Sequence, residues 1–487
     1  MAGRFARRAH VLRALAGAAL ALFAAGPAAA GIPEPGTCPP VQTSKTAAKE
    51  DAVSAPLHEG QALGIADLNS LRDLFPPELW RYRDVFFYEG MRLEIGPCHR
   101  RYPAGAGYDE ATQRFAGHAR LDEHGNLKGH VAGLPFPAVD PASPDAGLEW
   151  AWNFEQRYRA AGPIGGFRLL DLPGKIGKPA FYKGSFFQVD TGHRADLPAS
   201  NYRVPDVKDR LWVAGGQFDE PFDARYLAWR QLRPLDAEQR FEEPDDTFVY
   251  VPTMRKSRRA ATAWVDGLYM PRYLASGDAG GGGVPFGSNQ FGPTGSIQPT
   301  AGLSIAATEN ARRGFAGLAI RPNAYEWRVV AEREVLAPLN SSVPGWPENP
   351  DREYGPSGLS IASDRWDVRT AVVIEGRARK VVEDLGYVRL WIDEQTAQPL
   401  YVMTERPNRM LRDVGVMVHR YSGDQAQYPE FPNHGPANVF DPVGALFYEV
   451  SGGGSGWRRE SWDVRSLPVS PERMREMTNT EALEHQH

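Results

Sequence analysis

The pattern of apolar and polar positions predicts a chain built mainly from antiparallel strands. Val388, Leu390 and Ile392 alternate with Arg389 and Trp391, as in a strand that buries one face. Polar turns such as DEQT at 393–396 separate neighbouring segments of this kind, so successive strands should form one broad curved sheet. The alternating segments are 181–190, 224–236, 246–251, 325–340, 365–379 and 387–422. The 50 Gly and 41 Pro residues agree with many short strands and long connections.

Residues 145–161 are predicted to form an aromatic amphipathic helix. Trp150, Phe154 and Tyr158 recur at i, i+4 and i+8, Trp152 widens the apolar face, and Asp145 is a candidate N-cap. Such a helix either packs on the core of the sheet or forms a lid over a ligand, and packing is the favoured alternative.

Two further elements are predicted near the N-terminus. A short helix is expected at residues 65–74, where Pro76 and Pro77 stop it. Two strands are expected in residues 83–96, on either side of a turn at Glu89 and Gly90.

Residues 245–260 combine a hydrophobic strand with a basic run. Phe248 and Tyr250 occupy one face of the strand and are predicted to face a cavity or the helix layer, as is Trp229 of the preceding strand. Four basic residues follow at the far end of the strand or in the next turn: Arg255, Lys256, Arg258 and Arg259. They form either a solvated rim paired with acids such as Glu242, Glu243 and Asp246, or a contact for an anionic lipid headgroup or a membrane partner.

Residues 1–30 have the pattern of a cleavable signal peptide. Arginines precede an apolar run from Ala14 to Gly26, and small residues at 28–30 offer a cleavage site. No later segment has an apolar run long enough to span a membrane as a helix. The exported chain is therefore expected to be soluble and periplasmic, with outer-membrane association as an open alternative.

Charge and cysteine content narrow the class of protein. The chain has 55 basic and 60 acidic residues, and without the four arginines of residues 1–30 the net charge is −9. A balance this acidic argues against a nucleic-acid partner. In an oxidising compartment Cys38 and Cys98 are expected to form a disulfide that stabilises the fold by roughly 4 kcal/mol, although two separate thiols remain an alternative.

Enzyme signatures are missing from the sequence. It contains no GxSxG, HExxH or dinucleotide-binding motif, and we expect no cofactor. His118, His124 and His130 are six residues apart, a spacing that suits turns better than a metal site, and His193 has no evident carboxylate partner. The sequence therefore predicts no catalytic residue and no metal site, while a hydrolase built from distant carboxylates stays open.

Several segments together resemble a bacterial envelope family described as domain of unknown function 1329, which is grouped with periplasmic lipoprotein carriers of the LolA and LolB type. The matching segments are GLPFP at 133–137 with the helix at 147–159, YVPTMRKSRRA at 250–260 and LWIDEQTAQPLYV at 390–402. The resemblance spans residues 60–465 and carries over no catalytic residue.

The resemblance implies an α+β fold, mainly antiparallel β, in which a curved half-barrel sheet closed by helices surrounds an apolar cavity. The expected divisions are a signal peptide (1–30), an N-terminal arm (31–132), the half-barrel domain (133–465) and a polar C-terminal tail (466–487). The implied function is non-catalytic carriage of a lipid, a lipoprotein or another hydrophobic molecule, with inner- or outer-membrane transport proteins as partners. The alternative is an assembly or accessory factor of an envelope transport complex. The expected cavity or lid residues are Trp150, Trp152, Phe154, Tyr158, Trp229, Phe248 and Tyr250.

Overall fold

The computed structural model describes residues 57–172, 180–197, 202–205, 207, 209–240, 245–252, 255–259, 319–344, 352–382, 385–431, 435–450 and 456–484. The predicted signal peptide, Cys38 and the glycine-rich segments at 277–295 and 451–455 lie outside these residues. Within the described part, no helix has the length and apolar character needed to cross a membrane.

One sheet of 15 strands dominates the described structure. Its strands are β1 (Ala62–Leu63), β2 (Leu93–Cys98), β5 (Pro163–Leu172), β6 (Ala180–Asp190), β7 (Arg210–Glu220), β8 (Ala228–Pro234), β9 (Asp246–Val251), β10 (Lys256–Arg259), β11 (Tyr325–Ala337), β12 (Arg365–Val382), β13 (Leu385–Asp393), β14 (Pro399–Glu405), β15 (Leu411–Tyr421), β18 (Phe440–Glu449) and β19 (Gly456–Ser466). The pairing is antiparallel throughout except between β2 and β12.

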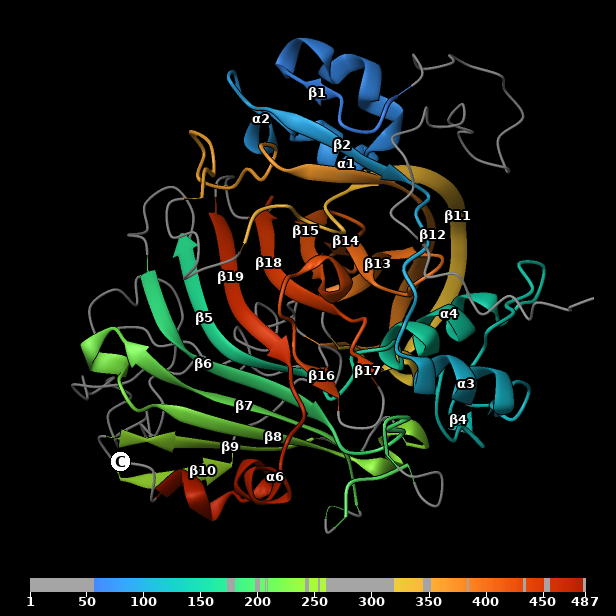
Figure 1. The fold of residues 1–487 in the computed structure, drawn as a ribbon, viewed down its shortest axis with the longest axis vertical. Helices are drawn as coiled ribbons and strands as arrows, with labels where there is room; N and C mark the ends of the chain where they lie inside the picture. Colours follow the sequence, from blue (N-terminus) through green and yellow to red (C-terminus); the bar gives the residue numbers. More distant parts are fainter. Residues whose placement is uncertain are drawn as a thin grey trace, which may run out of the picture.

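The strand order shows how the sheet is assembled. It runs β1-β2-β12-β13-β14-β15-β18-β19-β5-β6-β7-β8-β9-β10, and β11 pairs with β12. Two meanders, β12–β19 and β5–β10, thus join where β19 pairs with β5, from Trp457 opposite Leu172 to Ser466 opposite Pro163. In Figure 1 the strands follow a wide arc from β10 at the bottom to β11 at the upper right, with α3 and α4 between the two ends. The predicted fold class, a mainly antiparallel, open and curved sheet with few helices, is confirmed.

The remaining elements are short. The helices are η1 (Ile65–Leu74), α1 (Pro77–Arg81), α2 (Arg83–Phe86), α3 (Ala106–Arg114), α4 (Ala146–Glu155), η2 (Phe222–Ala224), η3 (Leu235–Glu238), η5 (Pro322–Ala324), η6 (Ser422–Asp424), α6 (Pro471–Thr478) and η7 (Glu481–Glu484). Two small hairpins pair β3 (Arg120–Leu121) with β4 (Leu127–Lys128) and β16 (Glu430–Phe431) with β17 (Gly435–Pro436).

Alternating residues of the sheet enter two separate hydrophobic cores. Ile374 and Leu390 pack in the core that contains the aromatic residues of α4. Val373 and Trp391, their neighbours in sequence, pack on the opposite face with residues of η1, α1 and α2. Since side chains of a strand point alternately to the two faces, both faces of this part of the sheet are covered.

The predicted strand at the start of residues 83–96 is wrong, because Arg83–Phe86 form α2. Phe86 and Phe87 are both buried in the same core. Consecutive residues of a strand point to opposite faces, so a strand could not place both rings there. The second predicted strand of this segment and the helix at 65–74 are confirmed as β2 and η1.

The aromatic helix is shorter than predicted, since α4 ends at Glu155. Asp145 occupies the predicted N-cap position, but its side chain makes no capping hydrogen bond. The guanidinium groups of Arg157 and Arg159 donate to the carbonyl oxygens of Phe154 and Glu155, at 2.7 and 2.8 Å. These bonds satisfy carbonyl acceptors of the last turn without further helix.

The charged segment after residue 470 is folded against the sheet. Ser470 caps α6 by accepting a hydrogen bond from the backbone N–H of Arg473 (3.2 Å). Met474 and Met477 pack with Val213 and Leu232 of β7 and β8. Figure 1 shows α6 beside the lower strands, β8 to β10.

Candidate ligand cleft and a neighbouring histidine–glutamate cluster

A cleft of about 230 Å³ lies where α3, the chain that follows α4 and the β13–β14 turn meet. Two segments that carry the family resemblance contribute to it. Leu134 comes from GLPFP at 133–137, and Gln395, Thr396 and Gln398 come from LWIDEQTAQPLYV at 390–402. The cleft is also lined by Tyr102, Tyr108, Tyr158 and Phe440, so aromatic rings and amide groups face the same space.

Tyr108 and Tyr158 form one wall of the cleft. Their ring centroids are 4.9 Å apart. The Tyr108 hydroxyl donates to the carbonyl oxygen of Gln156 (2.9 Å), and the Tyr158 hydroxyl donates to that of Ala437 (2.7 Å). Burial raises the pKa of both phenols, which therefore stay neutral and act as donors with fixed positions.

Tyr102 connects the cleft to a buried carboxylate. Its hydroxyl donates to Asp367, and its ring stacks edge-on with Phe440 at 5.1 Å. Burial raises the pKa of Asp367 to about 6, although the hydrogen bond from Tyr102 and the nearby Arg369 act in the opposite direction. Arg100 lies over the Tyr102 ring, 4.7 Å from its centroid.

The β13–β14 turn is held rigidly by Asp393. This residue accepts hydrogen bonds from the backbone N–H of Thr396 (2.9 Å) and from its hydroxyl (2.7 Å). Arg369 forms a buried ion pair with the same carboxylate at 2.7 Å. The turn thereby presents Gln395 and Gln398 to the cleft in fixed positions.

A second, smaller cavity of about 30 Å³ adjoins the cleft and shares Tyr108 and Tyr158 with it. It is lined by Arg157, Arg159 and His193 among others. Burial lowers the pKa of Arg157 to about 9. Arg159 is paired with Asp190 at 2.8 Å.

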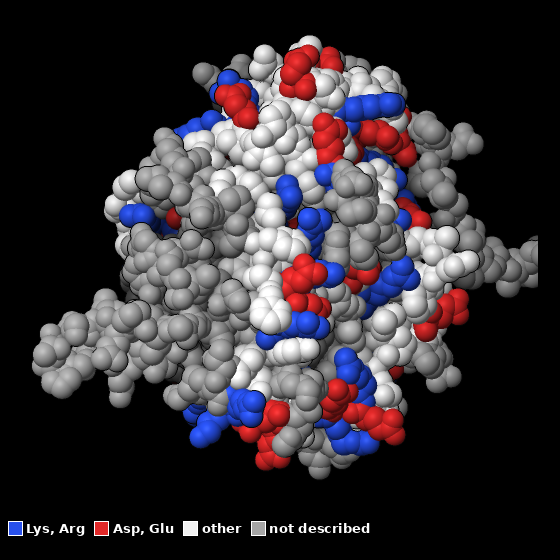
Figure 2. All heavy atoms as spheres, turned by 90° about the vertical axis from the view of Figure 1, so that its left-hand side faces the viewer, with Lys and Arg blue, Asp and Glu red and all other residues white. Residues whose placement is uncertain are grey.

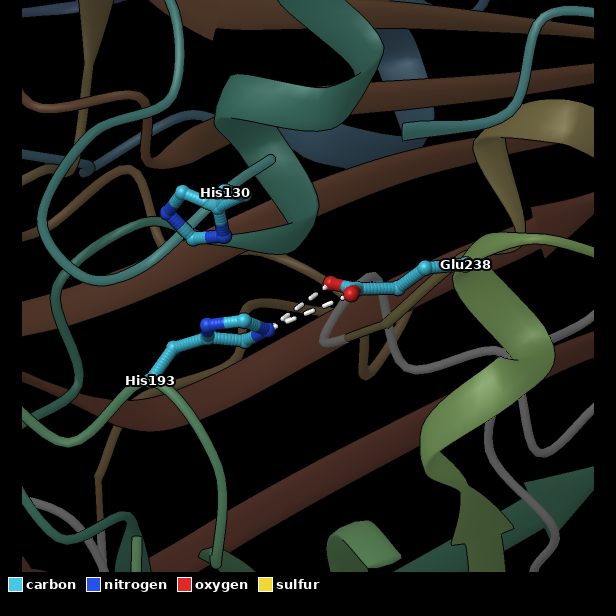
Figure 3. A group of neighbouring side chains, drawn as sticks. All are labelled: His130, His193 and Glu238. Carbon is cyan, nitrogen blue, oxygen red and sulfur yellow. Dashed lines mark hydrogen bonds and ion pairs between the residues drawn. The ribbon is translucent and has the colours of Figure 1, made fainter. Parts of the chain in front are cut away.

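His130, His193 and Glu238 come together beside this second cavity (Figure 3). The prediction that His193 lacks a carboxylate partner is wrong, because its Nε2 lies 3.2 Å from both oxygens of Glu238. The three residues lie far apart in sequence and only the fold brings them together, so spacing along the chain gave no signal. Among the residues that the structure describes, these three side chains place their possible ligand atoms within 4.8 Å of one another, which is close enough for a shared metal ion.

Three of the predicted cavity residues lie in the hydrophobic core. Trp152, Phe154 and Trp229 are almost completely buried in the core shared by α4 and the sheet, and Trp150 packs against the same core. Neither of the two cavities is lined by these residues, whereas Tyr158 lines both. The packing is that of a core helix, and a role for these tryptophans in ligand binding stays a prediction.

Buried ion pairs fix α4 to the sheet. Glu155 at its C-terminus pairs with Arg233 of β8 (3.0 Å) and accepts a hydrogen bond from the backbone N–H of Ile320 (2.8 Å). Arg233 and Arg321 both pair with Asp245. Breaking one partner of a buried network of this kind typically costs ~3–5 kcal/mol, which opposes any movement of the helix as a lid.

Phe248 and Tyr250 face the C-terminal helix layer. Phe248 packs beside the core formed with α6, and Tyr250 packs with Ala228 and Leu483 of η7. Of the two predicted environments, a cavity or the helix layer, the structure has the second. The antiparallel pairing predicted between this strand and the preceding one is confirmed.

Lys256–Arg259 of the basic run form a strand of their own, β10, and Arg255 lies in the turn before it. The predicted position in the next turn therefore holds for Arg255 and not for the other three residues. Arg259 pairs with Asp246 at 2.6 Å, and Arg255 and Lys256 are exposed. The side chain of Arg258 and residues Glu242 and Glu243 lie outside the described structure. In the described surface of Figure 2, Lys and Arg residues are interspersed with Asp and Glu residues. A lipid or partner contact at β10 stays a prediction, as does the disulfide, since Cys38 is not among the described residues.

The fold and the cleft define a class of protein: one with an open curved antiparallel sheet and a cleft lined by aromatic and polar residues. Residues 82–272 match the model of a family described as protein of unknown function (DUF1329), which confirms the predicted resemblance over this range. No curated protein matches the chain.

Solved structures with a similar arrangement share little sequence with this chain. A domain from Vibrio parahaemolyticus, named for outer membrane lipoprotein sorting, is 11% identical and has a TM-score of 0.38 over 70% of this chain and 100% of its own. A DUF1329 family protein from Desulfovibrio piger is 12% identical, with a TM-score of 0.38 over 71% and 99%. A LolA superfamily protein from Nitrosomonas europaea is 11% identical, with a TM-score of 0.31 over 71% and 100%. Similarities this distant say nothing about ligand or chemistry.

Proposed function

We propose that the protein is a non-catalytic binding protein of the bacterial periplasm that carries a lipid, a lipoprotein acyl chain or another hydrophobic molecule. The observation that carries this proposal is the cleft, in which the rings of Tyr102, Tyr158 and Phe440 face one space from three separate segments. Aromatic walls with a few convergent polar groups are typical of sites that bind small molecules.

The size of the cleft indicates what it would hold. Its volume of about 230 Å³ is below the ~300–1,000 Å³ of sites that enclose a whole drug-sized ligand. The cleft would therefore take one part of a larger molecule, such as a ring or the end of an acyl chain. Each buried methylene would contribute about 0.8 kcal/mol to binding. The exposed Arg101 and Asp109 at its margin could contact the polar remainder of the ligand.

Filling the cleft tests the proposal. Ala104 is half-buried in its lining, so Ala104→Trp should occupy the space and reduce the copurifying ligand at least tenfold. Native mass spectrometry and organic extraction of protein from its own periplasm would measure occupancy. Ala142→Trp, at an exposed position away from the cleft, is the matched control and should retain the ligand.

A second candidate function is an accessory factor of an envelope transport complex. The filled core around Trp152, Phe154 and Trp229 favours it, because these large side chains occupy the space that a sheet-lined cavity would need. The same experiment separates the two functions. Protein that purifies empty and takes up no fluorescent lipid would contradict the carrier and favour the accessory factor.

A further inference from the structure

We propose that His130, His193 and Glu238 form a binding site for a divalent transition metal ion, with zinc as the best-suited ion. The residues come from the loop after β4, the loop after β6 and the end of η3. One ligand atom of each lies within 4.8 Å of the others. Two imidazoles and a carboxylate form a ligand set that zinc uses with a fourth position left for water or another ligand. This proposal is independent of the carrier function.

Backbone carbonyls fix which nitrogen of each ring carries hydrogen. The carbonyl oxygen of Gly133 lies 2.9 Å from Nε2 of His130, and that of Val131 lies 2.8 Å from Nδ1 of His193. A carbonyl oxygen only accepts hydrogen bonds, so both of these nitrogens are donors. The other nitrogens, Nδ1 of His130 and Nε2 of His193, are then the ones available to a metal ion.

The two available nitrogens and the Glu238 carboxylate are all electron-pair donors, so a cation placed among them would be stabilised by all three. With Nδ1 of His193 as the donor, a neutral ring directs the lone pair of Nε2 at carboxylate oxygens 3.2 Å away. A proton on Nε2 would relieve that repulsion, yet it would leave Nδ1 of His130 without a partner. That atom is buried and has no hydrogen bond within the described residues. A metal ion would engage all three groups at once.

The distances suit a tetrahedral ion after a small adjustment. Ligand atoms at the usual bond lengths of ~2.0–2.1 Å are about 3.3 Å apart around such an ion, close to the 3.2 Å between His193 and Glu238. His130 must move closer by at most about 1.5 Å, because the ligand atoms lie within 4.8 Å of one another. Its ring already lies over that of His193, at 4.3 Å between centroids, and Figure 3 shows the carboxylate facing both rings.

Outer contacts of the kind found at zinc sites are present for every ligand. The hydrogen bonds to the carbonyl oxygens of Gly133 and Val131 orient the two rings. The side-chain Nε2 of Gln156 donates to Oε1 of Glu238 at 2.7 Å. Gln156 and His193 also line the second cavity, whose volume of about 30 Å³ is enough for a water molecule. An ion among the three ligands would therefore be reachable from that cavity and could hold water as its fourth ligand.

Metal binding by the full chain tests the proposal. Protein purified without a histidine tag would be stripped with a chelator, then titrated with zinc and measured by elemental mass spectrometry and chelator competition. We expect one zinc ion per chain. His130→Ala and Glu238→Gln should each lower the affinity more than tenfold, and Gln156→Ala should lower it about 10–100-fold as the loss of an outer contact does.

The matched control is His99→Asn. His99 pairs with Glu334 at 2.7 Å, but no third ligand adjoins the pair among the described residues. This variant should bind zinc as the unaltered chain does, and Asn tolerates the positive φ of 52° at this position. The visible spectrum of bound cobalt would report four-coordinate nitrogen and oxygen ligation without any substitution, in case a variant fails to fold. The absence of stoichiometric zinc, or unchanged affinity in folded His130→Ala, would overturn the proposal.

Discussion

Glu460 and Glu375 are buried glutamates of the same sheet whose surroundings shift their pKa values in opposite directions. Burial raises the pKa of Glu460 to about 7, and its neighbour Arg458 offsets this only in part. Burial would also raise the pKa of Glu375, but hydrogen bonds from Arg409, Arg389 and Arg328 lower it to about 2.

The opposite shifts predict opposite pH dependence of stability. Glu460 is protonated in the folded chain and ionised in the unfolded chain between about pH 4.5 and 7, so its contribution to stability is lost as the pH rises through that window. Glu460→Gln should therefore be more stable than the unaltered chain at pH 8, by on the order of 2–3 kcal/mol, and nearly equal to it at pH 4. Denaturant unfolding at a series of pH values measures this difference.

Glu375→Gln serves as the comparison of opposite sign. The carboxylate of Glu375 contributes stability above about pH 4.5, and this is lost as the pH falls toward 2. The variant should be less stable at pH 7, by about 2 kcal/mol, because Arg328, Arg389 and Arg409 each lose an ion pair with a carboxylate, although Arg389 and Arg409 keep Glu405. A Glu460→Gln variant that is less stable than the unaltered chain at pH 8 would contradict the conclusion that the ionised Glu460 carboxylate destabilises the folded state.

At the scale of elements, α6 shows how a short charged segment is anchored by two side chains. Met474 and Met477 point into a small core on β7 and β8, while Arg475 between them is exposed. Only these two methionines of the helix are buried. Two apolar residues among charged ones are too weak a pattern to predict from sequence that the helix packs on the sheet.

Met477→Ala should destabilise the protein by ~2–5 kcal/mol, because the substitution leaves a cavity between α6 and the sheet. Arg475→Ala, on the exposed face of the same helix, should change stability by less than about 0.5 kcal/mol. Thermal and denaturant unfolding of both variants would check this. Equal, small effects would mean that α6 contributes little to the folded state.

The strands were predictable because their pattern is local, whereas the sites were not. The alternation of Val388, Leu390 and Ile392 with Arg389 and Trp391 is visible within one segment and identifies β13. The cleft and the cluster of His193 with Glu238 combine residues from segments that only the fold brings together. The strand predicted at Phe86 and Phe87 was wrong for a related reason. Both rings pack in a core formed by residues that are distant in sequence, and this core determines the local backbone.

At the scale of the whole molecule, β10 is a basic strand at one end of the sheet of a protein with a net charge of −5. Lys256 in β10 and Arg255 in the turn before it are exposed, and Arg259 is already paired with Asp246. If β10 contacts anionic lipid headgroups, the first two residues would supply the available charge, each worth about 1 kcal/mol near a membrane surface.

Arg255→Glu with Lys256→Glu should then weaken binding to vesicles that contain an anionic phospholipid by at least tenfold. Cosedimentation at low and physiological salt would measure this. The double variant Arg114→Glu with Arg120→Glu reverses two exposed arginines on other elements and is the matched control. Equal binding by both variants would leave β10 as a solvated edge.

The pairing of β5 with β19 also bears on how the chain reaches this structure. Pro163 lies opposite Ser466, roughly 300 residues later in the sequence, so the two meanders cannot join until almost the entire chain has been synthesised. Until then β5 presents an open row of backbone donors and acceptors, to which a strand of another molecule could add. Folding to this structure therefore depends on keeping the open edge of β5 from pairing with other molecules until β19 has been made.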